Sequence, residues 1–282
     1  LNNEFGQFVV GRTPIHFGLG MVFSAGRGEF DHYFDLRDLV AYKMVFGNIY
    51  VMPSMAKLSE GRLNSGAEDA NEYNIHVNYE NPGSQLEMGL FYQMRRVNQA
   101  ANTLPTGLIG GTGSTVAEDA SFNHLGIYLN RDRENWRLGF EAGFRDGKSG
   151  VRTAVAESVE YSGQGLALEF EYRPKNKRYT WGVNAGQASG DDLGTDKKFE
   201  GFHFDRNYNV ALLLFNQQLG NADIFQNSLI GGGGQGGANG NTSVDVETVS
   251  NVVYLAPWID YKWKEHWTVT AKLVTGSVGE AL

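Results

Sequence analysis

Apolar and polar side chains alternate along several segments of about ten residues. The clearest case is residues 85–95, where Leu86, Leu90 and Met94 are among the apolar positions and Glu87 and Arg95 are among the polar ones. The same alternation recurs in residues 73–80, 136–145, 166–173 and 179–185. Because a β-strand points successive side chains to opposite faces, each segment predicts a strand with one apolar and one polar face.

The connections between these segments alternate strictly between short and long. The short ones are rich in turn formers and cover residues 46–48, 81–84, 131–135, 174–177 and 264–266. The long ones cover roughly residues 24–37, 59–71, 97–120, 146–163 and 190–247. This parity is typical of a meander that crosses a bilayer with short turns on one side and long loops on the other.

We therefore predict an all-β fold, an antiparallel transmembrane up-and-down β-barrel of about 12–18 strands that takes up residues 1–282 as one domain. No run approaches the roughly 18 apolar residues of a membrane helix, and strands can cross a bilayer only as a closed barrel. The pattern itself contains about eleven strands, whereas bacterial single-chain barrels have an even number. Together with the missing signal peptide and initiator Met, this predicts a mature or truncated chain that is incomplete at one or both ends, with at least one strand missing either from this interpretation of the pattern or from the chain.

Aromatic residues gather beside the short turns, as in the girdle at one membrane interface of a barrel. The alternative is that they are ordinary core aromatics of a β-sandwich. The predicted girdle consists of Tyr79, Trp136, Tyr172, Tyr179, Trp263 and Trp267.

Composition narrows the function classes. Gly makes up 37 of 282 residues, which suits close backbone approach and curvature. A hydrophobic content of 41% and a mean hydropathy of −0.35 are compatible with strands whose second face contacts water. The absence of Cys excludes disulfides and thiolate metal sites, and a net charge of −8 argues against nucleic acid as a partner. No cofactor is predicted.

The whole pattern resembles the porin-like β-barrels of the Gram-negative outer membrane. The segment from Gly11 to Met21 is similar, more weakly, to a strand-to-loop segment of alginate-export-like porins. The resemblance implies a location in the bacterial outer membrane, with outer-membrane lipid and lipopolysaccharide as surroundings. It also implies passive passage of small hydrophilic solutes, often by homo-oligomers. A barrel that anchors or scaffolds a partner protein or an adhesin, and a channel specific for oligosaccharide or polysaccharide export, are the alternatives.

The polar faces of the predicted strands supply candidate pore-lining residues of both charge signs. Such residues either line a water-filled pore with a transverse field or pair with one another to fill a closed barrel. They are Lys43, Asn74, His76, Glu80, Glu87, Arg95, Arg137, Glu141, Arg145, Glu169, Glu171, Arg173, Asn184, Asp260, Lys262 and Lys272. Phe91 and Tyr128 are the candidates for an aromatic track in the lumen.

The connection 190–247 is the longest, and loops of this size are usually functional or disordered. It contains the apolar hexamer Val210–Phe215, followed by a Gly-rich stretch at 231–241. We expect the hexamer to fold inward as a constriction, although an extra strand paired with residues 222–230 is the alternative.

Two chemical alternatives are weaker on sequence grounds. Carboxylates of the predicted loops offer oxygen ligands for calcium, but without EF-hand spacing: Glu29, Asp31, Asp35, Asp38, Asp191, Asp192 and Asp196. His76 is the candidate general base for catalysis, yet no Gly-x-Ser-x-Gly motif accompanies it. We therefore expect neither a metal site nor an enzyme.

Overall fold

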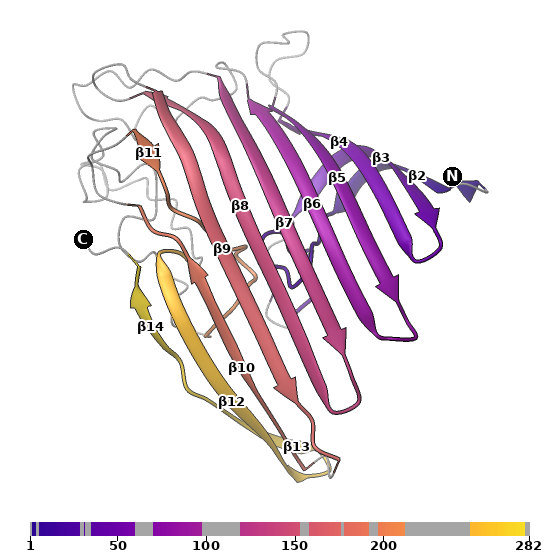
Figure 1. Cartoon of the computed structure of the whole chain (residues 1–282), viewed down its shortest axis with the longest axis vertical. Coiled ribbons are helices and arrows are strands. Elements are labelled where there is room, and N and C mark those ends of the chain that lie inside the picture. Colours follow the sequence, from indigo (N-terminus) through magenta and orange to yellow (C-terminus); the bar gives the residue numbers. More distant parts are fainter. Residues whose placement is uncertain are drawn as a thin grey trace.

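The computed structural model describes residues 2–3, 6–28, 31, 35–59, 70–97, 119–152, 158–175, 178–191, 197–211 and 249–279. Their strands form one 14-stranded sheet (Figure 1). The strands are β1 (Asn2–Asn3), β2 (Gly6–Pro14), β3 (Leu36–Phe46), β4 (Ile49–Ser59), β5 (Ala70–Asn81), β6 (Leu86–Val97), β7 (Ala120–Asp132), β8 (Trp136–Arg152), β9 (Ser158–Tyr172), β10 (Tyr179–Ala188), β11 (Lys198–Phe199), β12 (Val252–Lys264), β13 (Trp267–Lys272) and β14 (Thr275–Val278).

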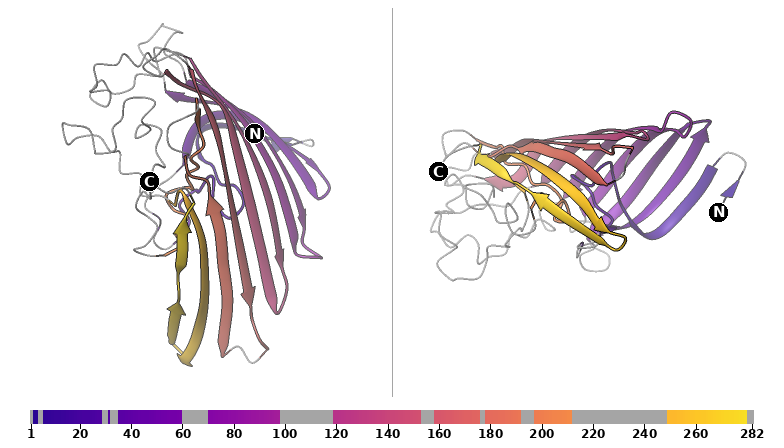
Figure 2. Two further views of the ribbon diagram at one scale, coloured as in Figure 1. Left: turned by 60° about the vertical axis from the view of Figure 1, so that its left-hand side comes forward. Right: turned by 90° about the horizontal axis from the view of Figure 1, so that it is seen from below.

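The strands follow one another in chain order. From β1 to β10, and on to β12 and β13, each pairs antiparallel with the next. Two short strands lie off this path, because β11 pairs in parallel with β9 and β14 extends the pairing of β12. The prediction of an all-β, antiparallel up-and-down fold is thus confirmed. The sheet is strongly curved (Figure 2), and among the described strands no pairing joins its first edge to its last.

The short turns lie where the pattern places them. Gly47 and Asn48 join β3 to β4, and Gly47 takes a φ of 60°, as two-residue hairpin turns require. Further short turns join β5 to β6, β7 to β8 and β12 to β13. These turns mark the short-turn end of the sheet, which points downward in Figure 1.

The predicted bounds of two connections, 146–163 and 24–37, were wrong. Residues 146–163 are mostly strand, because β8 and β9 stay paired as far as Lys148 and Glu160 and again at Arg152 and Ser158. Gly147 and Gly150, with φ of 142° and 78°, let β8 continue through this polar stretch. The first connection begins at residue 15 instead of 24, since β2 ends at Pro14 and the apolar residues after it leave the sheet.

The two faces of the sheet differ sharply. On the outer, convex face large apolar side chains stay exposed along almost every strand, among them Val40, Ile75, Leu90, Ile127 and Leu255. The inner, concave face carries most of the charged strand residues and the buried ones, including Glu72 and Glu141. Because the buried core also lies on the concave side, residues of this face position the candidate site.

Candidate functional site

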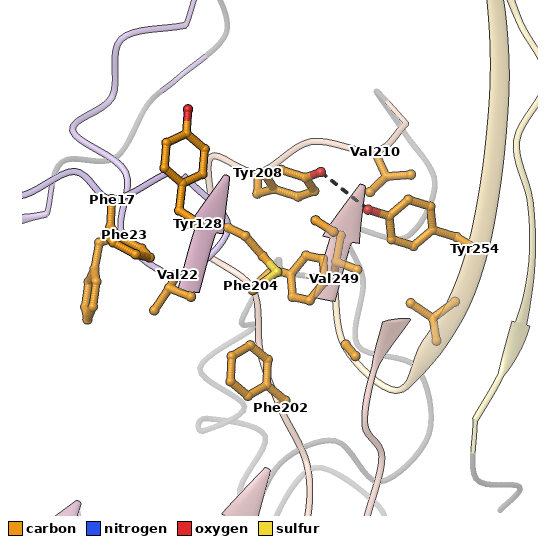
Figure 3. Close-up of a cluster of buried hydrophobic side chains, with 14 of the residues drawn as sticks. Phe17, Val22, Phe23, Tyr128, Phe202, Phe204, Tyr208, Val210, Val249 and Tyr254 are labelled. Atoms are coloured by element: carbon orange, nitrogen blue, oxygen red, sulfur yellow. Dashed lines mark hydrogen bonds between the residues drawn. The ribbon is translucent and has the colours of Figure 1, made fainter. Parts of the chain in front are cut away.

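Two inter-strand segments line the concave face, and we call them the inner layer. They are residues 15–28, which follow β2, and residues 197–211, which follow β10 and begin with the short strand β11. Their aromatic side chains form a core with residues of the sheet, as the close-up shows for Phe17, Phe202 and Phe204 (Figure 3). Phe17 is 1% exposed and Phe202 is 0% exposed. The inner layer therefore packs as closely as the interior of a soluble protein.

Glycines of the sheet provide the space for these rings. Gly126, Gly143 and Gly165 lie side by side on β7, β8 and β9 in the pairing register. A Cβ added at Gly126 would lie 2.8 Å from the Phe17 ring, and one added at Gly165 would lie 2.6 Å from the Phe202 ring. The inner layer can approach the sheet this closely only because these positions lack side chains.

Glu141 of β8 holds the first segment of the inner layer. Its carboxylate is fully buried and accepts the backbone N–H groups of Leu19, Met21 and Val22 at 2.7, 3.1 and 3.1 Å. Backbone donors in such a buried place would be costly to leave unpaired. Glu141 thus fixes the turn at residues 18–22 to the sheet.

Asp205 joins the two segments of the inner layer. Its backbone N–H donates to the Met21 carbonyl at 2.6 Å, and its carboxylate accepts the N–H groups of Ser24 and Asn207. Burial raises the pKa of Asp205 to about 7, and a hydrogen bond with the Asp35 side chain adds to the rise. Arg37 lies 3.8 Å from that Asp35 carboxylate. Asp205 therefore keeps its proton to a higher pH than an ordinary aspartic acid.

A third contact links the inner layer to the short-turn end. The Tyr208 hydroxyl donates to Glu169 of β9 at 3.3 Å and lies 3.5 Å from the Tyr254 hydroxyl of β12 (Figure 3). Below these groups the concave face opens into a pocket of about 330 Å³, which we call the turn-side pocket. It is lined by Arg137, Glu169, Phe170, Glu171, Asn184, Trp258, Asp260, Thr270 and Lys272.

The pairing register and strand alternation place the candidate pore-lining residues on the concave face. Six of them line the turn-side pocket. Others contact the core: His76 packs against Phe17 and Tyr50, and the Arg145 guanidinium lies 5.5 Å from the centre of the Phe202 ring. Lys43 lies 3.9 Å from the centre of the Tyr50 ring. The remaining candidates on this face are Asn74, Glu80, Glu87, Arg95, Glu141, Arg173 and Lys262.

Sequence reasoning missed several residues of this face. Glu72 is fully buried and lies 3.0 Å from Arg95 and 3.4 Å from Arg37. His124 and Trp258 also face inward, since His124 pairs with Arg145 and Trp258 pairs with Lys272. Extending the alternation two residues back from Asn74 would have found Glu72. Phe91 and Tyr128, the candidates for an aromatic track in the lumen, do not line an open space, because both side chains are buried beside Phe17.

The six predicted girdle aromatics all lie on the outer face beside the short turns. Tyr172 and Tyr179 are exposed, and Trp263 and Trp267 are 64% and 65% exposed. Tyr172 also packs against Trp181, with ring centres 5.5 Å apart.

Carboxylates considered for calcium have other partners. Asp38 pairs with Arg12 at 2.7 Å, Asp31 accepts the Gly28 N–H, and Asp191 accepts the Glu200 N–H. Glu29, Asp192 and Asp196 lie outside the described residues. Within the part of the chain that the structure describes, no group of three or more metal-binding side chains occurs.

The described part of connection 190–247 turns inward. Val210 and Ala211, the first residues of the apolar hexamer, are buried, and Val210 contributes to the core. The rest of the hexamer, residues 222–230 and the Gly-rich stretch lie outside the described residues.

Comparisons with known proteins add little. No family model and no curated protein matches the sequence. Among solved structures, the outer-membrane expressed OmpT of Vibrio cholerae matches with a TM-score of 0.43 and 10% identity over 97% of this chain and 67% of that one. The toluene transporter TodX of Pseudomonas putida matches with a TM-score of 0.31 and 10% identity, over 86% and 69%. Likenesses this low decide nothing about location or activity.

Replacing Glu141 tests how the inner layer is held. Glu141→Ala leaves three buried N–H groups without their acceptor, at a cost of about 1–3 kcal/mol each before relaxation. We expect hydrogen exchange of the Leu19, Met21 and Val22 amides to accelerate at least about tenfold. The control is Glu80→Ala, which removes an exposed carboxylate from the same face. Equal exchange in both variants would contradict the role of Glu141.

The raised pKa of Asp205 predicts a pH dependence. Between about pH 4 and pH 7 the docked segment keeps Asp205 protonated, whereas an undocked segment ionises near the ordinary value of 3.8. Docking is therefore most favoured at low pH and weakens as the pH rises through about 7. Exchange of the Ser24 and Asn207 amides, corrected for intrinsic rates, should accelerate between pH 5 and pH 8, and Asp205→Asn should flatten this dependence. A pH-independent wild type would refute the raised pKa of Asp205.

Proposed function

We propose that this chain forms the wall of a β-barrel in the bacterial outer membrane and acts as a porin-like channel for small hydrophilic solutes. The observation that carries the proposal is the opposite character of the two faces. Large apolar side chains are 39–49% exposed on the outer face at Val40, Ile75, Leu90, Ile127 and Leu255, while charges lie on the inner face. A soluble protein rarely exposes so continuous an apolar surface.

The aromatic residues beside the short turns support the same placement. Tyr172, Tyr179, Trp263 and Trp267 lie on the outer face at the short-turn end, where a barrel has its interfacial girdle. Under this proposal the short turns face the periplasm and the long connections face outward. An open sheet edge would leave backbone groups unpaired in lipid, so the edges of the sheet close in the membrane, with each other or with further strands.

The inner layer gives the proposed channel a constriction. A solute that enters from the short-turn end reaches the turn-side pocket first, and its charged lining suits an aqueous path. Beyond the pocket, the Tyr208–Glu169 contact and the buried core narrow the lumen. We propose that the rate of passage depends on how firmly the inner layer is docked.

We further propose that this protein has no catalytic role. His76, the candidate base, packs against the aromatic rings of Phe17, Tyr50 and Phe91. A general base needs its nitrogen within hydrogen-bond reach of the proton it removes, and the neighbours of His76 are rings.

Placement of the outer face in lipid predicts an asymmetry between neighbouring residues of β6. Leu90→Arg puts a charge in the bilayer and should lower the free energy of unfolding in lipid vesicles by about 2–4 kcal/mol. Glu87→Arg, three residues earlier on the opposite face, should change it by less than about 1 kcal/mol and alter ion selectivity instead. Urea unfolding in vesicles measures the first effect and reversal potentials measure the second. Equal tolerance at both positions would contradict the assignment of faces.

Single-channel recording of the refolded full chain in a planar bilayer tests the channel itself. We expect steady conductance in the wild type and a larger conductance in Glu141→Ala, because the variant loosens the constriction. Glu80→Ala serves again as the control on the same face. Silence of all three proteins, despite confirmed folding, would refute the channel and favour the anchor or scaffold role.

A further inference from the structure

We propose that the turn-side pocket is a binding subsite for the ring of a neutral sugar, with Trp258 as the surface on which the ring stacks. This inference rests on the proposed function, since the pocket would be the first binding site that a solute meets when it enters from the short-turn end. Its support comes from how Trp258 is held, from the charge balance of the lining and from the size of the pocket.

Trp258 is held in a fixed orientation on the concave face. A Cβ added at Gly182 of β10 would lie 2.6 Å from two atoms of the indole ring, so the ring rests directly on the backbone of the neighbouring strand. Its indole N–H donates to the Asn184 side-chain oxygen at 3.2 Å. Trp258 is half-buried and lines the turn-side pocket, so the part of the indole that β10 does not cover borders the pocket.

The polar groups around this ring offer donors and acceptors in a balanced set. Arg137 lies 3.3 Å from Glu169, and Arg173, at the rim, lies 2.8 Å from Glu171. Asp260 accepts the Thr270 hydroxyl at 2.7 Å, and Lys272 completes the lining. With Arg137 and Lys272 set against Glu169, Glu171 and Asp260, and Arg173 beside Glu171, positive and negative side chains are equal in number, so the pocket attracts a free ion of either sign only weakly.

An aromatic surface beside alternating donors and acceptors fits one class of solute. A sugar ring has an apolar face made of C–H groups, which can cover an indole, and hydroxyl groups at its edge, which can both donate and accept hydrogen bonds. A pocket of about 330 Å³ is at the small end of ligand sites and suits a single ring. A simple ion or a small alcohol would leave the indole surface in water.

Binding is measured on the refolded full chain in detergent micelles by isothermal titration with maltose as the probe, one of whose two rings would occupy the pocket while the other lies outside it. Conduction requires that a bound solute can leave, so we expect a dissociation constant on the order of 1–10 mM. Trp258→Ala should weaken binding at least tenfold. Trp181→Ala, which removes a tryptophan from the outer face of β10, is the matched control and should leave the constant unchanged.

A second variant keeps the proposal testable if Trp258→Ala does not fold. Asp260→Asn preserves shape but removes a charged acceptor, and it should weaken maltose binding several-fold. Choline is the comparison probe, because a tryptophan beside carboxylates could instead hold a cation. Tighter binding of choline than of maltose would overturn the sugar assignment, as would wild-type affinity in both variants.

Channel recording separates this inference from the proposed function. Added maltose should reduce the wild-type current in a concentration-dependent manner and leave the Trp258→Ala current unchanged. Conductance without maltose binding would refute the sugar subsite but would remain consistent with the proposed channel. Maltose binding that depends on Trp258, in a protein that never conducts, would support the subsite and refute the channel.

Discussion

The buried carboxylate of Glu141 is the interaction on which the arrangement of the concave face depends. It accepts three backbone N–H groups from the turn at residues 18–22, which have no other route to pairing once Met21 and Val22 are buried. With that turn in place, Phe17 fills the space over Gly126, and the Met21 carbonyl receives the N–H of Asp205. The second segment of the inner layer thus docks partly on the first.

This arrangement explains why polar and apolar groups share one face. A sheet of this curvature has more room on its concave side than its own side chains fill. The inner layer occupies part of that room with an aromatic core, and the charged residues nearer the short turns are left to surround the turn-side pocket. Glycines such as Gly143 and Gly165 mark where the layer touches the sheet, whereas Asp260 and Lys272 line the open pocket. The face is therefore divided into a packed part and an open part.

The sequence predicts the strands well because each strand shows a local alternation of apolar and polar residues. Alternation of period two assigns Leu90 to one face and Glu87 to the other without any tertiary information, and the short turns are equally local. The inner layer is different. Its contacts, such as Glu141 with Leu19 and Tyr208 with Glu169, join residues far apart in the chain and have no period. A glycine that makes room for a packed ring, such as Gly126, cannot be told in the sequence from a glycine that allows the sheet to curve. For this reason the sequence predicts neither that the first connection begins at residue 15 nor that Phe91 is buried.

The most direct test of the account is whether the segment at Leu19 contacts β8 inside the folded barrel. A Cβ added at Gly139 would lie 2.7 Å from the Leu19 side chain, and the chain contains no Cys, so the pair Leu19→Cys and Gly139→Cys reports only this contact. In the chain refolded into lipid vesicles and treated with a mild oxidant, a disulfide should form rapidly and in high yield, and the oxidised protein should conduct less than the reduced one. A pair that stays reduced in the folded protein would contradict the docked inner layer and the constriction built on it.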